Sequence, residues 1–128
     1  MSTAATTGTP ATLATLATMD RHWKALVRGD VPGLIADYAA DAVFIAGVTG
    51  VITGRAAIGA VLMQFVSHII PAAGTAFSLD LTLAEGTLGY IVWKAESATH
   101  RISFSSDTFV VIDGLITQQT SAGSVVTK

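Results

Sequence analysis

The stretch SFSSDTFVVIDGLITQQTS, residues 103–121, predicts a β-hairpin whose two strands meet at Asp113-Gly114. An acidic residue followed by glycine favours a two-residue turn, because such turns need positive φ angles at both central positions. Asp107 leads directly into the apolar run of the first strand. A carboxylate is costly to bury unless it is paired or protonated. The face of the sheet that Asp107 occupies therefore decides whether it marks a site.

The rest of the chain divides into helices and strands by the same local signals. We expect residues 1–13 to be a flexible tail and residues 14–128 to form a single domain. Helices come first and a long meander of strands follows, which is typical of an α+β domain. We expect three helices: residues 14–28, a short helix that begins after the capping residue Asp30, and residues 56–70. The expected strands are at 42–46, 51–53, 77–84, 88–96, 101–112 and 115–121.

Two-residue turns fix the register of neighbouring strands, and cross-strand partners share a face. Counting from the turns places Asp107 opposite Tyr90 on one side and Thr120 on the other. We therefore expect a polar cluster on an apolar face, which is typical of a ligand cavity between sheet and helices. The residues expected to bind a ligand there are Tyr38, Tyr90, Val92, Phe109, Gln118 and Thr120.

The composition predicts a protein that covers part of its own surface with a second copy. Apolar residues make up 51% of the chain and charged residues only 12%, about half the usual charged share. Trp93 and Phe104 are expected on the outer face of the sheet, which would form a homodimer interface. The predicted partners are therefore a small apolar molecule and a second copy of the chain.

Several classes of function lack their signals. The net charge of −2 and the absence of a basic cluster argue against nucleic-acid binding. The most apolar stretch, residues 56–70, is too short and too polar to span a bilayer, so no membrane partner is expected. The chain has no cysteine, and its three histidines fall in separate elements, so we expect no metal and no cofactor. The lack of cysteine also agrees with a cytoplasmic location.

Motifs in three parts of the chain resemble the nuclear transport factor 2-like superfamily, and more narrowly its SnoaL-like group, which includes ketosteroid isomerase. The motifs are GDVPGLIADYAADAVF (29–44), GRAAI (54–58) and DTFVVIDGLI (107–116), and the resemblance covers roughly residues 19–123. It implies a cone-shaped, curved antiparallel sheet wrapped around a long helix, with about three helices and six strands. Members include isomerases, cyclases, epoxide hydrolases, dehydratases and proteins that only bind, so the resemblance specifies the fold better than the chemistry.

The comparison with ketosteroid isomerase can be made residue by residue. The family's catalytic tyrosine falls at His22, its general-base aspartate at Ala46 and its oxyanion-hole aspartic acid at Asp107. An alanine cannot abstract a proton, so isomerisation of that type would need His22 or Glu96 as the base. The resemblance thus implies Asp107 and His22 as catalytic candidates for cofactor-independent acid/base chemistry. The alternative is a non-catalytic binding or dimerisation module in which both residues make structural hydrogen bonds.

Overall fold

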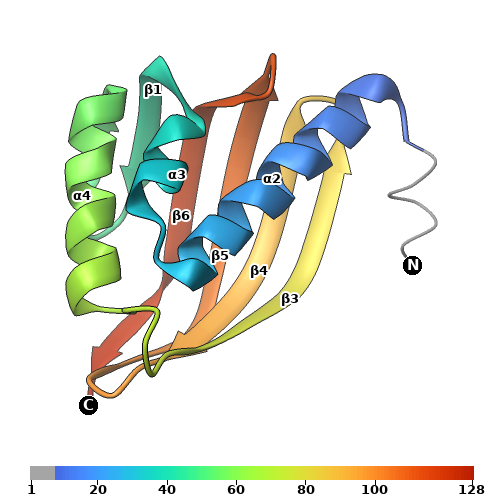
Figure 1. The fold of residues 1–128 in the computed structure, drawn as a ribbon. Helices are drawn as coiled ribbons and strands as arrows, with labels where there is room; N and C mark the ends of the chain where they lie inside the picture. Colours follow the sequence, from blue (N-terminus) through green and yellow to red (C-terminus); the bar gives the residue numbers. More distant parts are fainter. Residues whose placement is uncertain (1–7) are drawn as a thin grey trace.

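The computed structural model describes residues 8–128, in which three helices lie on one side of a curved six-stranded sheet (Figure 1). This arrangement confirms the predicted α+β class. The helices are α2 (Pro10–Arg28), α3 (Val31–Ala36) and α4 (Arg55–His68). The strands are β1 (Tyr38–Ala46), β2 (Gly50–Thr53), β3 (Ala76–Glu85), β4 (Leu88–Glu96), β5 (His100–Ile112) and β6 (Leu115–Thr127).

Helix α2 begins four residues earlier than the sequence predicts. The Thr9 side chain caps it by accepting a hydrogen bond from the amide of Thr12, and Pro10 occupies the first turn. Proline suits that position because its missing N–H would have no partner there. Gly29 ends the helix with a φ of 71°, a left-handed conformation that glycine adopts easily. Residues 10–13 are therefore helical, and the remainder of the predicted tail lies largely outside the described residues.

Threonines on α2 attach the helix to two hairpin turns of the sheet. The Thr15 hydroxyl donates to the carbonyl of Gly86 at 2.6 Å, and the Thr18 hydroxyl donates to that of Gly114 at 3.1 Å. The amide of Gly86 donates in turn to the Thr12 hydroxyl. The helix face against the sheet thus carries threonines as well as Met19. These bonds give the partly buried backbone of both turns the partners it needs.

Helix α4 covers the other half of the same sheet face, beside β1 and β2 (Figure 1). Its buried side chains are Ile58, Leu62 and Val66. Gly59 lies against Ile35 of α3 so closely that a Cβ on this glycine would lie 2.8 Å from the Ile35 Cδ1 atom. The glycine therefore allows the two helices to pack together. No helix within residues 8–128 has the length and apolar character needed to cross a membrane.

The strand order in the sheet is β2-β1-β6-β5-β4-β3. The predicted meander from β3 to β6 is antiparallel throughout, and β1 and β2 form a further antiparallel pair. Strand β1 pairs with β6 in the parallel direction, so the sheet is mixed. This pairing places the end of α3 and the start of β1 beside the first residues of β6, directly after the turn of the last hairpin. It creates a site from segments that are far apart in the sequence.

The predicted register is wrong over part of the sheet because β-bulges shift it by one residue. Strand β5 has one extra residue opposite the stretch from Trp93 to Ala95 of β4, and β6 has one extra residue opposite the step from Val110 to Val111 of β5. A one-residue shift moves every following side chain to the opposite face. Asp107 consequently lies opposite Ile91 and Ser121.

These shifts move several predicted cavity residues to the outer face of the sheet. Tyr90 pairs with Thr108 instead of Asp107, and Val92 pairs with Ser106. Gln118 pairs with Val110. By the alternation of strand side chains, all of these residues face away from the helices, as does Thr120.

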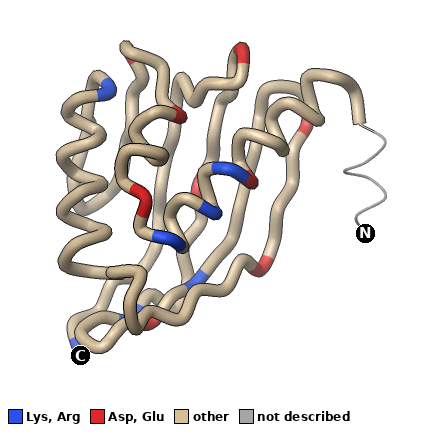
Figure 2. Tube along the Cα trace, viewed as in Figure 1, with Lys and Arg blue, Asp and Glu red and all other residues tan. Residues whose placement is uncertain are grey.

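The bulges also separate the two residues predicted for a dimer interface. Trp93 is turned inward and is only 5% exposed, so its assignment to the outer face is wrong. Phe104 is 52% exposed, as the prediction required. Figure 2 shows few charged residues along the strands, and exposed apolar side chains on the sheet include Leu81, Leu83 and Ile112. Homodimer formation through this face stays a prediction.

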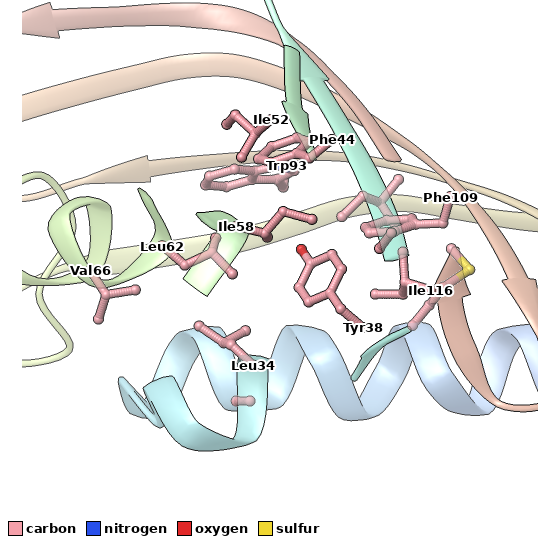
Figure 3. Packing of buried hydrophobic residues seen from close by; sticks show 14 of the residues in the cluster. Leu34, Tyr38, Phe44, Ile52, Ile58, Leu62, Val66, Trp93, Phe109 and Ile116 are labelled. Atoms are coloured by element: carbon pink, nitrogen blue, oxygen red, sulfur yellow. The ribbon is translucent and has the colours of Figure 1, made fainter. Parts of the chain in front are cut away.

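The core lies between the helices and the inner face of the sheet. Figure 3 shows Trp93 with Phe44 and Ile52, and Tyr38 with Ile58, within one buried cluster. Strands and helices both contribute to it, so the cluster joins the two layers of the domain. Burial of such side chains stabilises the fold by about 1.5–3 kcal/mol each.

Candidate functional site

A cavity of about 340 Å³ lies between the helices and the inner face of the sheet. The β1–β2 turn at residues 47–49, helix α4 and the end of β6 border it. Most of its wall is apolar, with Met19, Trp23, Leu34, Phe44, Leu62 and Phe65 among the lining residues. A mostly apolar cavity with a few polar groups is the usual form of a small-molecule site.

The structure brings together about half of the residues that the sequence predicts for this site. His22, Tyr38, Asp107 and Phe109 line the cavity. The other four predicted ligand-binding residues do not, because they lie on the outer face. Residues that the sequence analysis missed take their places: Trp93, Ser105, Gln119 and Ser121 line the cavity.

Asp107 is the buried carboxyl group of the site, with only 6% of its surface exposed. The indole N–H of Trp93 donates to its Oδ1 atom at 2.8 Å. The side-chain amide of Gln119 donates to its Oδ2 atom, also at 2.8 Å. Burial raises the pKa of Asp107 above its usual value, although these hydrogen bonds act to lower it. The group is therefore held in place while remaining able to take up a proton more readily than an exposed aspartate.

Tyr38 connects Asp107 to helix α2. Its hydroxyl donates to Oε1 of Gln119 at 2.5 Å and lies 3.2 Å from Nε2 of His22. Tyr38 is 1% exposed, and burial, followed by the charges of Asp107 and Asp37, raises its pKa. The phenol therefore keeps its proton and acts as a hydrogen-bonding group rather than as a phenolate.

Asp37 completes this chain of contacts, and the sequence analysis did not identify it. It caps the C-terminal end of α3, where its Oδ2 atom lies 2.9 Å from Nδ1 of His22. The guanidinium of Arg21 donates to its Oδ1 atom at 2.7 Å. Burial acts to raise the pKa of Asp37, but the bonds from His22 and Arg21 outweigh it and lower the pKa overall. Asp37 is therefore an ionised carboxylate that holds the histidine ring.

The contacts form one continuous chain, from the half-exposed Arg21 through Asp37, His22, Tyr38 and Gln119 to Asp107 and Trp93. Every fully buried side-chain nitrogen and oxygen in residues 8–128 has a hydrogen-bond partner. The chain is thus fixed before any ligand enters. A preorganised polar network in an apolar cavity can orient a ligand and exchange a proton with it.

Neither Ala46 nor Glu96, the two other positions considered for a general base, can transfer a proton in the cavity. Ala46, at the position of the family's general base, lines the cavity but carries no group that transfers protons. Glu96 accepts hydrogen bonds from Lys128 and Arg101, which lower its pKa to about 2. It does not line the cavity and cannot replace the missing base.

The sequence family follows from a direct comparison. The SnoaL-like domain model matches residues 19–119, most of the chain. The chain belongs to this family. The match covers α2 from Met19 onward and all the strands that hold the site except the end of β6. The comparison with curated proteins found no match.

Solved structures of several bacterial proteins have the same fold. An NTF-2 like protein of unknown function from Burkholderia xenovorans has a TM-score of 0.74 and 19% identity, covering 89% of this chain and 85% of that one. An LEH-like epoxide hydrolase from M. tuberculosis has a TM-score of 0.69 and 16% identity, covering 88% and 84%. A protein with a cystatin-like fold from Silicibacter pomeroyi has a TM-score of 0.68 and 19% identity, covering 84% and 73%. At these identities the likeness shows the SnoaL-like chain's fold and not its chemistry.

Proposed function

We propose that this SnoaL-like protein binds a small, mostly apolar molecule in the cavity and exchanges a proton with it at Asp107. The observation that carries the proposal is a buried carboxyl group, fixed by Trp93 and Gln119, that lines a mostly apolar cavity. The apolar wall favours an apolar ligand, and the single carboxyl group would position one polar group on it.

The free hydrogen-bonding capacity of Asp107 supports this role. An ionised carboxylate has about four lone-pair sites, and the bonds from Trp93 and Gln119, with Ser121 as a further partner, leave part of that capacity free. A hydroxyl group on the ligand can therefore donate to Asp107 without displacing a partner. The proposed chemistry is cofactor-independent, of the isomerase, cyclase, dehydratase or hydrolase type. One structural neighbour, the M. tuberculosis protein, is described as an epoxide hydrolase.

Binding can be tested with indanol, a bicyclic apolar alcohol, by titration calorimetry. We expect Ala46→Phe to weaken its binding by roughly tenfold or more, because the larger side chain fills part of the cavity. Ile45→Phe is the matched control: Ile45 is the preceding residue of β1, is 45% exposed and does not line the cavity. Equal affinities for the two variants, or no binding to the wild-type protein, would contradict the proposed ligand class.

Proton transfer can be tested with indanone, the ketone of the same ring system. In heavy water we expect the protein to speed deuterium uptake at the carbon beside the carbonyl, followed as loss of the methylene signal in proton NMR. Asp107→Asn should lower the catalysed rate by about 100-fold or more, the usual contribution of a general acid or base. Its melting temperature, measured in parallel, shows whether the fold is retained.

The second candidate function is ligand binding without catalysis. It is favoured by the complete satisfaction of the buried polar groups in residues 8–128, which is also what a structural network requires. Wild-type protein that binds indanone but does not catalyse deuterium uptake would support this alternative. A cytoplasmic location and homodimer formation likewise stay predictions.

A further inference from the structure

We propose that Gln119 couples the protonation of Asp107 to that of His22, so that a proton gained at one of these residues is matched by a proton lost at the other. Gln119 is then a positioning residue, because it acts through its neighbours. The inference rests on the proposed function only in assigning proton exchange with a ligand to Asp107. The coupling itself is a property of the protein without ligand.

The coupling follows from the three hydrogen bonds that connect the two residues. They join His22 Nε2 to Tyr38 Oη at 3.2 Å, Tyr38 Oη to Gln119 Oε1 at 2.5 Å, and Gln119 Nε2 to Asp107 Oδ2 at 2.8 Å. Each bond holds one hydrogen between two heavy atoms. Tyr38 has a single proton, and the Gln119 amide has a donor at one end and an acceptor at the other. The direction of one bond therefore sets the direction of the next.

In the first arrangement, Asp107 is ionised. The Gln119 amide nitrogen donates to it, so the Gln119 oxygen accepts the Tyr38 proton. Tyr38 must then accept from a proton on Nε2 of His22. The other ring nitrogen, Nδ1, faces the carboxylate of Asp37, which only accepts, so it carries a proton too. His22 is therefore an imidazolium whenever Asp107 is a carboxylate bonded in this way.

In the second arrangement, Asp107 is protonated at Oδ2 and donates to the Gln119 oxygen. The amide has turned over, its nitrogen donates to Tyr38, and Tyr38 donates to an unprotonated Nε2 of His22. One proton has left His22 and one has arrived on Asp107, while Tyr38 keeps one proton and Gln119 keeps two. Both arrangements give every link one donor and one acceptor. Turning Gln119 alone would place donors or acceptors against each other.

The charges around the cluster favour a coupled change over two separate ones. Within residues 8–128, the charged groups in this chain of contacts are Arg21 on the helix of His22, Asp37 from the end of α3, and Asp107 from β5. Moving a proton from His22 to Asp107 removes a positive and a negative charge together, so the net charge of the buried cluster stays constant. A change of net charge in a low-dielectric interior costs more than an internal transfer. His22 is thus the counterpart that compensates for protonation of Asp107 at the cavity.

Asp107→Asn tests the coupling without any ligand. The Trp93 indole N–H can only donate, so the new amide must turn its oxygen toward Trp93 and its nitrogen toward Gln119. This orientation imposes the second arrangement. At a pH at which Asp107 is a carboxylate, we expect nitrogen NMR of labelled protein to show both ring nitrogens of His22 protonated in the wild type. In the variant, Nε2 should shift to the position of an unprotonated ring nitrogen while Nδ1 keeps its proton.

Two comparisons separate this coupling from a direct effect of the Asp107 charge on His22. Gln118→Leu alters the neighbouring outer-face residue and should leave the response of His22 to Asp107→Asn intact. Gln119→Leu breaks the chain, so adding Asp107→Asn to it should no longer change the His22 signals. Tyr38→Phe breaks the chain at another link, which keeps the test available if Gln119→Leu does not fold.

The outcomes are distinct from those of the ligand experiments. An Asp107→Asn protein in which His22 Nε2 stays protonated would overturn the coupling, even if indanol binds. A response of His22 that persists in the Gln119→Leu and Tyr38→Phe backgrounds would overturn the role of Gln119, because the charge alone would then act on the ring. A protein that shows the coupling but binds neither indanol nor indanone would contradict the proposed function and leave the coupling in place.

Discussion

Trp93→Ala will lower the free energy of unfolding by about 3–5 kcal/mol, the cost of removing a large buried aromatic side chain. Trp93 is 5% exposed and makes an edge contact with Trp23, with ring centroids 5.7 Å apart. Its indole N–H also donates to Asp107, which would lose that partner. Thermal denaturation should show a fall in melting temperature on the order of 10–20 °C.

The control is Phe104→Ala, an aromatic-to-alanine change on the neighbouring strand. Phe104 is 52% exposed on the outer face, so its removal should cost less than about 1 kcal/mol in the monomer. The strand pattern alone places Trp93 and Phe104 on the same face, and the bulges place them on opposite faces. Similar losses for the two variants would show that the bulged register is wrong, and the site with it.

The elements of this fold could be predicted from the sequence because their signals are local. The turn at Asp113-Gly114 has φ angles of 52° and 77°, the positive values that the acidic-glycine pair predicts. Gly29 ends α2 in the left-handed conformation, and Asp30 caps α3 through the amide of Gly33. Each of these features depends on a few consecutive residues, so an amino-acid pattern is enough to identify it.

The face of each strand could not be predicted so well, because a bulge needs no distinctive residue. Gln118 and Gln119 are identical, and Thr120 and Ser121 are both hydroxyl residues. A shift of one residue therefore leaves the polar pattern unchanged while it exchanges the inner and outer members of each pair. The sequence pattern therefore predicts Gln118 at the cavity, where the structure has Gln119, a side chain of the same type.

The contacts of Asp37 with His22 and Arg21 could not be predicted, because these residues come together only in the folded chain. Asp37 lies at the end of a short helix, and nothing nearby in the sequence marks it as buried. One usable signal was present on α2, where Thr15, Thr18 and His22 repeat at helical spacing. A polar stripe on the helix face that also carries Met19 indicates that this face meets polar groups of the sheet.

The second large effect is expected for Asp37→Ala, which should lower the free energy of unfolding by about 3 kcal/mol at neutral pH. Breaking a buried ion pair leaves the partner's charge or proton without its acceptor. Here the partners are the buried His22 and the half-exposed Arg21, so the loss lies at the lower end of the range for such pairs. Urea denaturation followed by circular dichroism measures it. Asp41→Ala, which removes an exposed carboxyl on the adjoining strand β1, should change stability by less than about 0.5 kcal/mol.

The pH dependence of this loss identifies its cause. The pKa of Asp37 is lower in the folded chain than its ordinary value of 3.8, so its stabilisation is complete above that value and disappears as the pH falls through the folded value. The difference between wild type and Asp37→Ala should therefore shrink in acid. Asp107 acts in the opposite direction, because its raised pKa makes the folded chain lose stability as the pH rises through the raised value. Asp107 is present in both the wild type and Asp37→Ala. Where its pKa is the same in the two proteins, its contribution cancels in the difference between their free energies of unfolding. A deficit that stays constant down to the acid limit would show that Asp37 stabilises the fold by packing and not by its charge.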